Sequence, residues 1–184
     1  MKINQEQIDK KGCGGKPRMA CNMTSKLYDL RKSFVYAFRG VVFCIRYERN
    51  MRIHVTATVY VFFFALTFYE LNRAELILLI LTCSVVMSLE ALNTALEVLT
   101  DKASPEYSSL AKAAKDAAAG AVLLSSIAAA IIGVLLFWDL EMFRVIADYF
   151  IQSPLLLVAL LISAILAGIF VLNGKERRKR GKRK

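Results

Sequence analysis

The composition and charge of this chain exclude an ordinary soluble domain. Of its 184 residues, 57% are hydrophobic, which is more than globular proteins in water usually carry. The chain also carries 25 Lys and Arg against 15 Asp and Glu, a formal net charge of +10. So much charge fits so apolar a chain only if the two kinds of residue are segregated, and the sequence shows that segregation.

The chain opens with polar and basic sequence. We expect residues 1–26 to form a flexible leader, because they contain too few apolar residues to build a core. From residue 27 to about residue 52, apolar residues recur three or four positions apart, with basic residues between them. This spacing predicts an amphipathic helix on the membrane surface.

Four long apolar segments follow, and each predicts a helix that crosses the membrane. A spanning helix needs roughly 20 residues, and the uncharged runs that approach or exceed this length are 53–69, 76–89, 117–138 and 149–174. Charged residues complete the second span. The predicted fold is all-α and integral to the membrane: a surface helix and three spans over residues 27–140, a fourth transmembrane helix over 141–174, and a basic tail over 175–184.

The basic residues predict the orientation of the spans. Residues 1–52, the loop 96–118 and the tail hold 23 of the 25 Lys and Arg, and the two remaining loops hold only Arg73 and Arg144. Lys and Arg are concentrated on the cytoplasmic side of membrane proteins. We therefore expect a multi-pass protein of the cytoplasmic membrane with both termini in the cytoplasm.

A polar stripe on the second span carries the candidate chemistry. Glu90, Asn93, Glu97 and Asp101 are spaced i, i+3, i+7 and i+11, so on a helix they point into a sector of roughly 80°. If the span enters near Glu75, Glu90 lies roughly 22 Å into a core about 30 Å thick. Ionisable groups at that depth are costly and mark functional sites. The structural alternative is that these are ordinary charges at a helix end, paired with Lys102 or Lys115.

Two further clusters lie near the same membrane interface. Lys112, Lys115 and Asp116 precede the apolar part of the third span, and Glu48 stands among arginines where the surface helix meets the first span. Carboxylates without cysteine or histidine suit a hard cation such as Mg²⁺ with a phosphate ligand.

The stripe also resembles a known family signature. The run from Glu90 to Asp101, EALNTALEVLTD, is similar to the pattern E-x-x-N-[ST]-A-[IL]-E-x-x-x-D of the small prokaryotic diacylglycerol kinases. Further matches stand in the expected order, namely YAFRG from Tyr36, ERNMRIH from Glu48, Glu106-Tyr107, and AKAAKD ending at Asp116. The segments NMRIH and NTALE resemble the Gram-positive branch of this family, whose members phosphorylate undecaprenol.

This resemblance implies a kinase domain over residues 27–140 and a homotrimer with sites shared between neighbouring chains. It implies that ATP and Mg²⁺ are used and that Glu90 is the catalytic base in contact with the lipid. Glu48 and Glu97 then hold the metal and the nucleotide, with Asn93 and Asp101 as supporting polar groups of the site. The remaining positions implied to contact ATP are Tyr36, Glu106, Tyr107, Lys115 and Asp116.

Undecaprenol is the expected substrate, and diacylglycerol is the runner-up. A third alternative is a non-catalytic transporter or assembly protein, but a transport pathway needs polar groups through the whole membrane, and here they are confined to the inner quarter. No nucleic-acid partner is expected, because no stacking aromatics accompany the basic tail. The fourth helix departs from the family pattern, and the resemblance implies no role for it.

Overall fold

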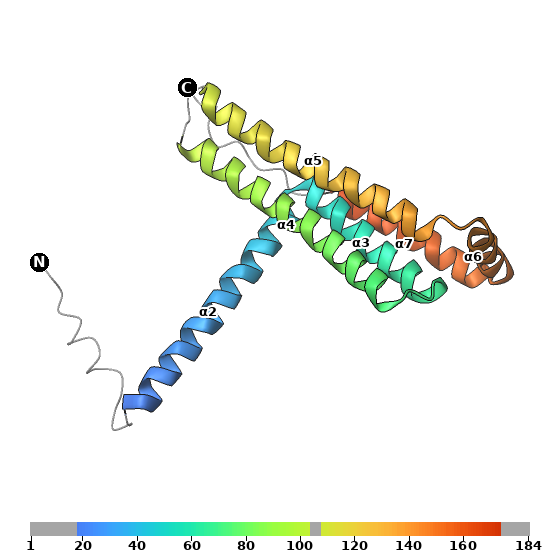
Figure 1. Cartoon of the computed structure of the whole chain (residues 1–184), viewed down its shortest axis with the longest axis horizontal. Helices are drawn as coiled ribbons and strands as arrows, with labels where there is room; N and C mark the ends of the chain where they lie inside the picture. Colours follow the sequence, from blue (N-terminus) through green and yellow to red (C-terminus); the bar gives the residue numbers. More distant parts are fainter. Residues whose placement is uncertain (1–17, 104–107, 174–184) are drawn as a thin grey trace, which may run out of the picture. The chain divides into compact units, whose positions relative to one another are not determined.

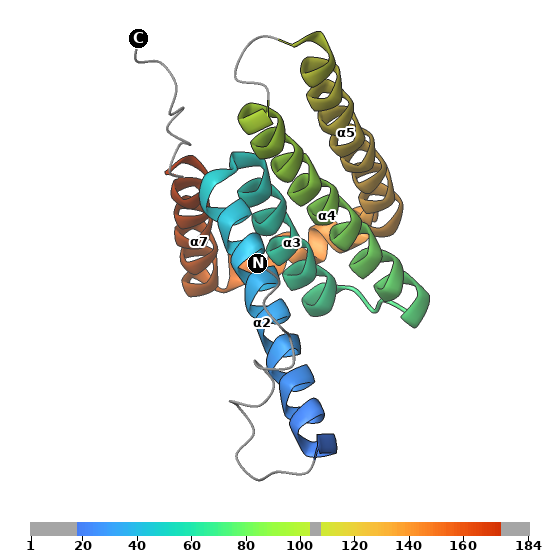
Figure 2. The same cartoon turned by 90° about the vertical axis from the view of Figure 1, so that its left-hand side faces the viewer.

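The structure is a computed structural model that describes residues 18–103 and 108–173. Within these residues it is all-helical, as the sequence predicts (Figures 1 and 2). The helices are α2 Arg18–Tyr47, α3 Arg49–Phe68, α4 Arg73–Ala103, α5 Ser109–Phe137, α6 Leu140–Gln152 and α7 Pro154–Leu172. Most of the predicted leader and the basic tail 175–184 lie outside the described residues.

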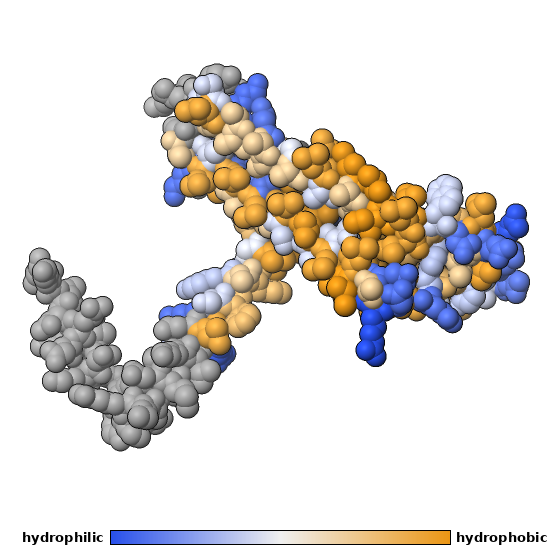
Figure 3. Space-filling view, in the orientation of Figure 1, coloured by the Kyte–Doolittle hydropathy of each residue, from blue (hydrophilic) through white to orange (hydrophobic). Residues whose placement is uncertain are grey.

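Four of these helices are long and apolar enough to cross a membrane. They are α3, α4, α5 and α7. Their large apolar side chains are mostly exposed, as expected where the surrounding solvent is lipid. Figure 3 shows hydrophobic residues over the middle of the bundle and hydrophilic residues toward its ends, including the end near α6. The predicted membrane-spanning, all-α fold class is confirmed.

The chain divides into two compact units, Met1–Val42 and Phe43–Lys184. Most of α2 belongs to the first unit, where Phe34 and Phe38 are exposed on one face of the helix. The helix begins at Arg18, inside the segment predicted as leader, and ends at Tyr47 rather than near residue 52. It ends there because Glu48 has an extended backbone conformation, with φ −107° and ψ 123°, and is the N-cap of α3.

The second unit is a row of packed helices. Helix α4 packs against both α5 and α3, and α7 packs against the other side of α3. Figure 2 shows this order. Few side chains are fully buried, and among the residues described in this unit the buried polar ones are Arg52, Glu90, Asn93 and Thr94.

The segment after α5 differs from the single helix predicted over residues 141–174. Two helices occupy it, the 13-residue amphipathic α6 and the apolar α7. The break falls at Ser153, which has non-helical dihedral angles, and Pro154 occupies the first turn of α7. Proline disfavours helical geometry in the residue before it and starts helices well. Asp139 caps α6 by accepting hydrogen bonds from the amides of Glu141 and Met142, at 2.9 and 3.2 Å.

Aromatic side chains join α6 to the end of α3. The ring centroid of Phe68 lies 5.2 Å from that of Tyr149 and 6.0 Å from that of Phe150. The centroids of Phe64 and Phe150 are 6.4 Å apart. Nearby, the Tyr69 hydroxyl donates to the carbonyl of Phe137 at 2.9 Å. Burial and the negative charge of Asp139 raise the pKa of Tyr69, so the hydroxyl keeps the proton that it donates. These contacts join the C-terminal ends of α3 and α5 to α6.

Phe150 should anchor α6. It is 7% exposed, whereas Phe143 on the same helix is 44% exposed. We expect Phe150→Ala to destabilise the detergent-solubilised protein by about 3 kcal/mol, and Phe143→Ala to cost clearly less. Thermal unfolding of both variants measures the difference, and equal melting temperatures would contradict this role.

Candidate functional site

The polar stripe of α4 is buried at its centre. Glu90 is 1% exposed and Thr94 is 2% exposed, while Asn93 is also buried. The Thr94 hydroxyl donates to the Glu90 carbonyl at 2.9 Å, so it is satisfied within the helix. A carboxyl group buried in a spanning helix is costly unless it has a partner or a function. Glu90 is therefore the centre of the candidate site.

The start of α3 brings further polar groups to Glu90. Asn50 hydrogen-bonds the Glu90 carboxyl, and Glu48 and Glu97 lie close enough to interact with it electrostatically. The break in the helix at Glu48 places that residue beside α4, although it is far from Glu90 in the sequence. Carboxyl groups that interact in this way repel one another, and the repulsion favours a hydrogen-bond donor or a positively charged ligand nearby.

Two oxygen atoms in the cluster lack partners. Glu90 Oε2 and Asn93 Oδ1 are buried and have no hydrogen-bond partner among the described residues. The amide of Asn93 donates to Glu97 Oε1 at 3.4 Å, which aligns these two side chains along the stripe. Buried polar atoms are nearly always satisfied. The two oxygens are thus free to accept hydrogen bonds from a ligand.

The end of the stripe contacts the third span. Lys115 on α5 forms an ion pair with Asp101 on α4. This pairing is the one that the structural alternative anticipated for Asp101. Asp116, the next residue on α5, is exposed, and Ser108 caps the helix by accepting from the Ala111 amide at 3.3 Å. Asp101 and Lys115 thus meet at the same end of α4 as Glu97.

Three of the sequence-predicted site residues are not placed in this cluster. Tyr36 lies on α2 in the first unit and is 61% exposed. Glu106 and Tyr107 lie outside the described residues. The roles assigned to all the predicted site residues remain predictions.

Sequence reasoning missed Asn50, Thr94 and Arg52. Asn50 and Arg52 were inside the ERNMRIH match without any role, and Thr94 was inside the stripe signature. Arg52 is only 6% exposed and its Nε has no hydrogen-bond partner in the described part of the chain. An arginine in the first turn of a span was a usable signal, because a buried guanidinium requires partners.

Comparison with known proteins assigns the family. The family profile described as prokaryotic diacylglycerol kinase matches residues 35–137, more than half of the chain. The chain belongs to the prokaryotic diacylglycerol kinase family. It is therefore a membrane lipid kinase, and the non-catalytic alternative has no support. The match covers α3, α4 and α5, while α6 and α7 lie beyond it.

Two curated relatives are similar to the chain at nearly equal identity. A diacylglycerol kinase from Synechocystis sp. is 43% identical over 121 residues, which cover 65% of this chain and 69% of the relative. An undecaprenol kinase from Bacillus subtilis is 42% identical over 106 residues, which cover 58% of this chain and 85% of the relative. No solved structure matches the chain. The comparisons support the kinase prediction and do not choose between the two lipids.

The ion pair between Asp101 and Lys115 allows structural and catalytic roles to be separated. Both side chains are partly exposed, so the pair should contribute no more than about 1 kcal/mol to stability. Exchanging the two residues, Asp101→Lys with Lys115→Asp, should preserve the melting temperature because the pair can re-form. The family resemblance implies that Lys115 contacts ATP, and on that prediction activity should fall about 100-fold, because a carboxylate replaces the cation at its position. Full activity in the exchanged variant would show that the pair only joins the helices.

Proposed function

We propose that this protein transfers the γ-phosphoryl group of ATP to the primary hydroxyl of undecaprenol, with Glu90 as the catalytic base. The observation that carries the proposal is the burial of Glu90, with its Oε2 unpartnered, in a spanning helix beside Glu48 and Glu97. Membership of the lipid kinase family supplies the reaction class. The lipid and the residue roles are the parts that we propose.

Glu90 suits the role of base because of its depth and surroundings. A lipid hydroxyl near the headgroups can reach this depth from the bilayer. As the hydroxyl oxygen forms its bond to the γ-phosphorus, the bond from that phosphorus to the bridging oxygen of ADP breaks. The hydroxyl proton passes to the Glu90 carboxylate. A base held in a dry site and positioned by Asn50 needs little rearrangement to act.

Glu48 and Glu97 are the proposed ligands for Mg²⁺ carried by ATP. In the described residues no group of three or more His, Cys, Asp or Glu side chains could hold a metal by itself. Mg²⁺ commonly binds one or two carboxylates together with phosphate oxygens and water, so this donor set fits a metal–nucleotide complex. When bound, the ion neutralises charge on the β- and γ-phosphate oxygens. Glu97 lies two turns along α4 from Glu90, roughly 10 Å along the axis.

The remaining nucleotide contacts and the assembly follow the family resemblance. Asn93 and Asp101 would support the site, and the proposed ATP contacts are Tyr36, Glu106, Tyr107, Lys115 and Asp116. We propose a homotrimer in which neighbouring chains share sites. The proposed location is the bacterial cytoplasmic membrane with both termini in the cytoplasm, because 23 of the 25 basic residues lie at the ends and in the loop 96–118.

Undecaprenol is our first choice of lipid. The alignment with the Bacillus subtilis undecaprenol kinase covers 85% of that relative, and the motifs NMRIH and NTALE resemble that branch. Diacylglycerol is the second candidate, because the Synechocystis diacylglycerol kinase aligns over more residues of this chain.

A γ-phosphate transfer assay tests both the reaction and the lipid. The purified protein receives labelled Mg-ATP in mixed micelles that contain either undecaprenol or diacylglycerol. We expect label in undecaprenyl phosphate, and we expect Glu90→Gln to reduce the rate at least 100-fold while the melting temperature is retained. Preferential labelling of diacylglycerol would select the second lipid. Normal turnover by Glu90→Gln would overturn the role of the base.

The metal role of Glu48 and Glu97 has its own test. We expect Glu97→Gln and Glu48→Gln to raise the Mg²⁺ concentration needed for half-maximal rate about tenfold or more. Glu75→Gln is the matched control, because Glu75 lies at the opposite end of α4, where it accepts from the Asn72 amide. An unchanged Mg²⁺ requirement in both site variants would contradict the assignment.

A further inference from the structure

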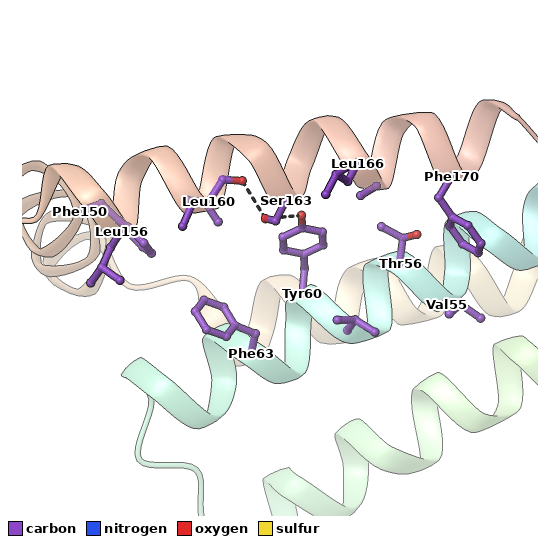
Figure 4. Close-up of a pocket in the computed structure, with 13 residues that line it drawn as sticks. Val55, Thr56, Tyr60, Phe63, Phe150, Leu156, Leu160, Ser163, Leu166 and Phe170 are labelled. Carbon is purple, nitrogen blue, oxygen red and sulfur yellow. Dashed lines mark hydrogen bonds between the residues drawn. The ribbon is translucent and has the colours of Figure 1, made fainter.

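The family match does not include α7, and a large pocket lies between this helix and α3. Its volume is about 630 Å³. Figure 4 shows its walls: Phe170 lies beside Val55 at one end, and Leu156 lies toward Phe63 at the other. Because α7 is beyond the matched region, the proposed kinase site does not account for this pocket.

Two of the three polar side chains that line the pocket, Tyr60 and Ser163, share a hydrogen bond. Ser163 Oγ donates to the Leu160 carbonyl at 2.8 Å, which uses its only proton. The Tyr60 hydroxyl, 2.9 Å from Ser163 Oγ, must therefore be the donor in that second hydrogen bond. Thr56 is the other polar side chain in the lining, and the rest is hydrocarbon. Such a pocket offers water too few partners to hold it, so the expected occupant is apolar.

The packing of α7 also requires that the pocket be filled. No residue of α7 is buried, although the helix packs against α3. An empty space of this size would deprive both walls of van der Waals contacts. Its lining runs from Leu156 to Phe170 along α7, roughly 21 Å at 1.5 Å per residue, against about 15 Å for half of the hydrocarbon core. The lining is therefore long enough to hold one acyl chain of a bilayer lipid.

Arg52 is a charged residue of α3 that lies just before the lining of the pocket and is not itself part of it. It precedes Val55 and Thr56 by three and four residues, so it continues the stripe of α3 that lines the pocket. Asn50, which contacts Glu90, lies roughly 160° away round the helix. Arg52 is 6% exposed and its Nε has no hydrogen-bond partner in the residues described. A buried guanidinium at the end of a span is suited to a phosphate.

We infer that the α3–α7 pocket binds an anionic phospholipid of the bilayer, with one acyl chain between the two helices and its phosphate against Arg52. The lipid fills the space that the two helices leave, and so attaches α7 to the kinase core. In the sequence, eight Lys and Arg follow α7 within residues 175–184, and such basic segments attract anionic lipid. The inference does not depend on which lipid the enzyme phosphorylates.

Native mass spectrometry of the full-length protein tests this inference. The protein is titrated in neutral detergent with dioleoyl phosphatidylglycerol or with dioleoyl phosphatidylcholine. We expect one tightly bound phosphatidylglycerol per chain and a preference of about tenfold over phosphatidylcholine. Arg52→Gln should remove the preference, and Arg52→Lys should retain part of it because the charge remains.

A matched pair of alanine variants tests the position of the acyl chain. Ala167 lines the pocket, whereas Ala164 is exposed on α7 and is not part of the lining. We expect Ala167→Phe to weaken binding of both phospholipids about tenfold, and Ala164→Phe to leave binding unchanged. Size-exclusion profiles and helical circular dichroism show whether each variant is folded.

Three outcomes would overturn the inference. Equal lipid binding by the two alanine variants would place the lipid elsewhere. A change of oligomeric state in Ala167→Phe without loss of lipid would mean that a second copy of the chain fills the pocket. Equal binding of phosphatidylglycerol and phosphatidylcholine by the unaltered protein would mean that the pocket does not select an anionic phospholipid.

Discussion

A carboxyl group buried within a membrane-spanning helix is the constraint on which this structure depends. Glu90 is almost completely enclosed, and Glu48, Asn50 and Glu97 are among its neighbours. Placing an ionisable group there costs free energy, which the fold must offset elsewhere. The break between α2 and α3 is part of this arrangement, because it brings Glu48 and Asn50 beside α4.

The length of α4 allows one helix to reach from the hydrocarbon core of the bilayer into water. Its 31 residues extend roughly 46 Å, well beyond the 30 Å hydrocarbon core. The uncharged part can lie among lipid chains while Glu97 and Asp101 lie toward water. A kinase that transfers a phosphoryl group from ATP to a lipid alcohol must bring together two substrates that do not mix. A stripe that runs along one helix from one solvent to the other provides that meeting place.

The helices beyond the family match follow a different physical logic. Helix α6 is fixed by aromatic contacts with the end of α3, whereas α7 buries none of its own residues. In water such a helix would be weakly held. In a bilayer, apolar faces have little to gain from leaving lipid, so helices associate through close packing and polar contacts. Between α3 and α7 the hydrogen bond of Tyr60 and Ser163 is one such contact, and a bound lipid chain would supply the packing.

The sequence by itself determined the fold class, the four spans and the polar stripe of α4. These properties are encoded locally, in the length of uncharged runs and in spacing at helical period. It failed at the break before Pro154, because the uncharged run 149–174 continues from the end of α6 through α7, and at the start and end of α2.

Only the tertiary structure decided which side chains surround Glu90, because Asn50 and Glu48 reach it from another helix. The pairing of Asp101 with Lys115 was one of two possibilities until α5 was placed against α4. The α3–α7 pocket had no sequence signature, since it depends on how two apolar helices fail to fit closely. Packing between elements that are distant in the chain cannot be predicted from the spacing of apolar residues within either element.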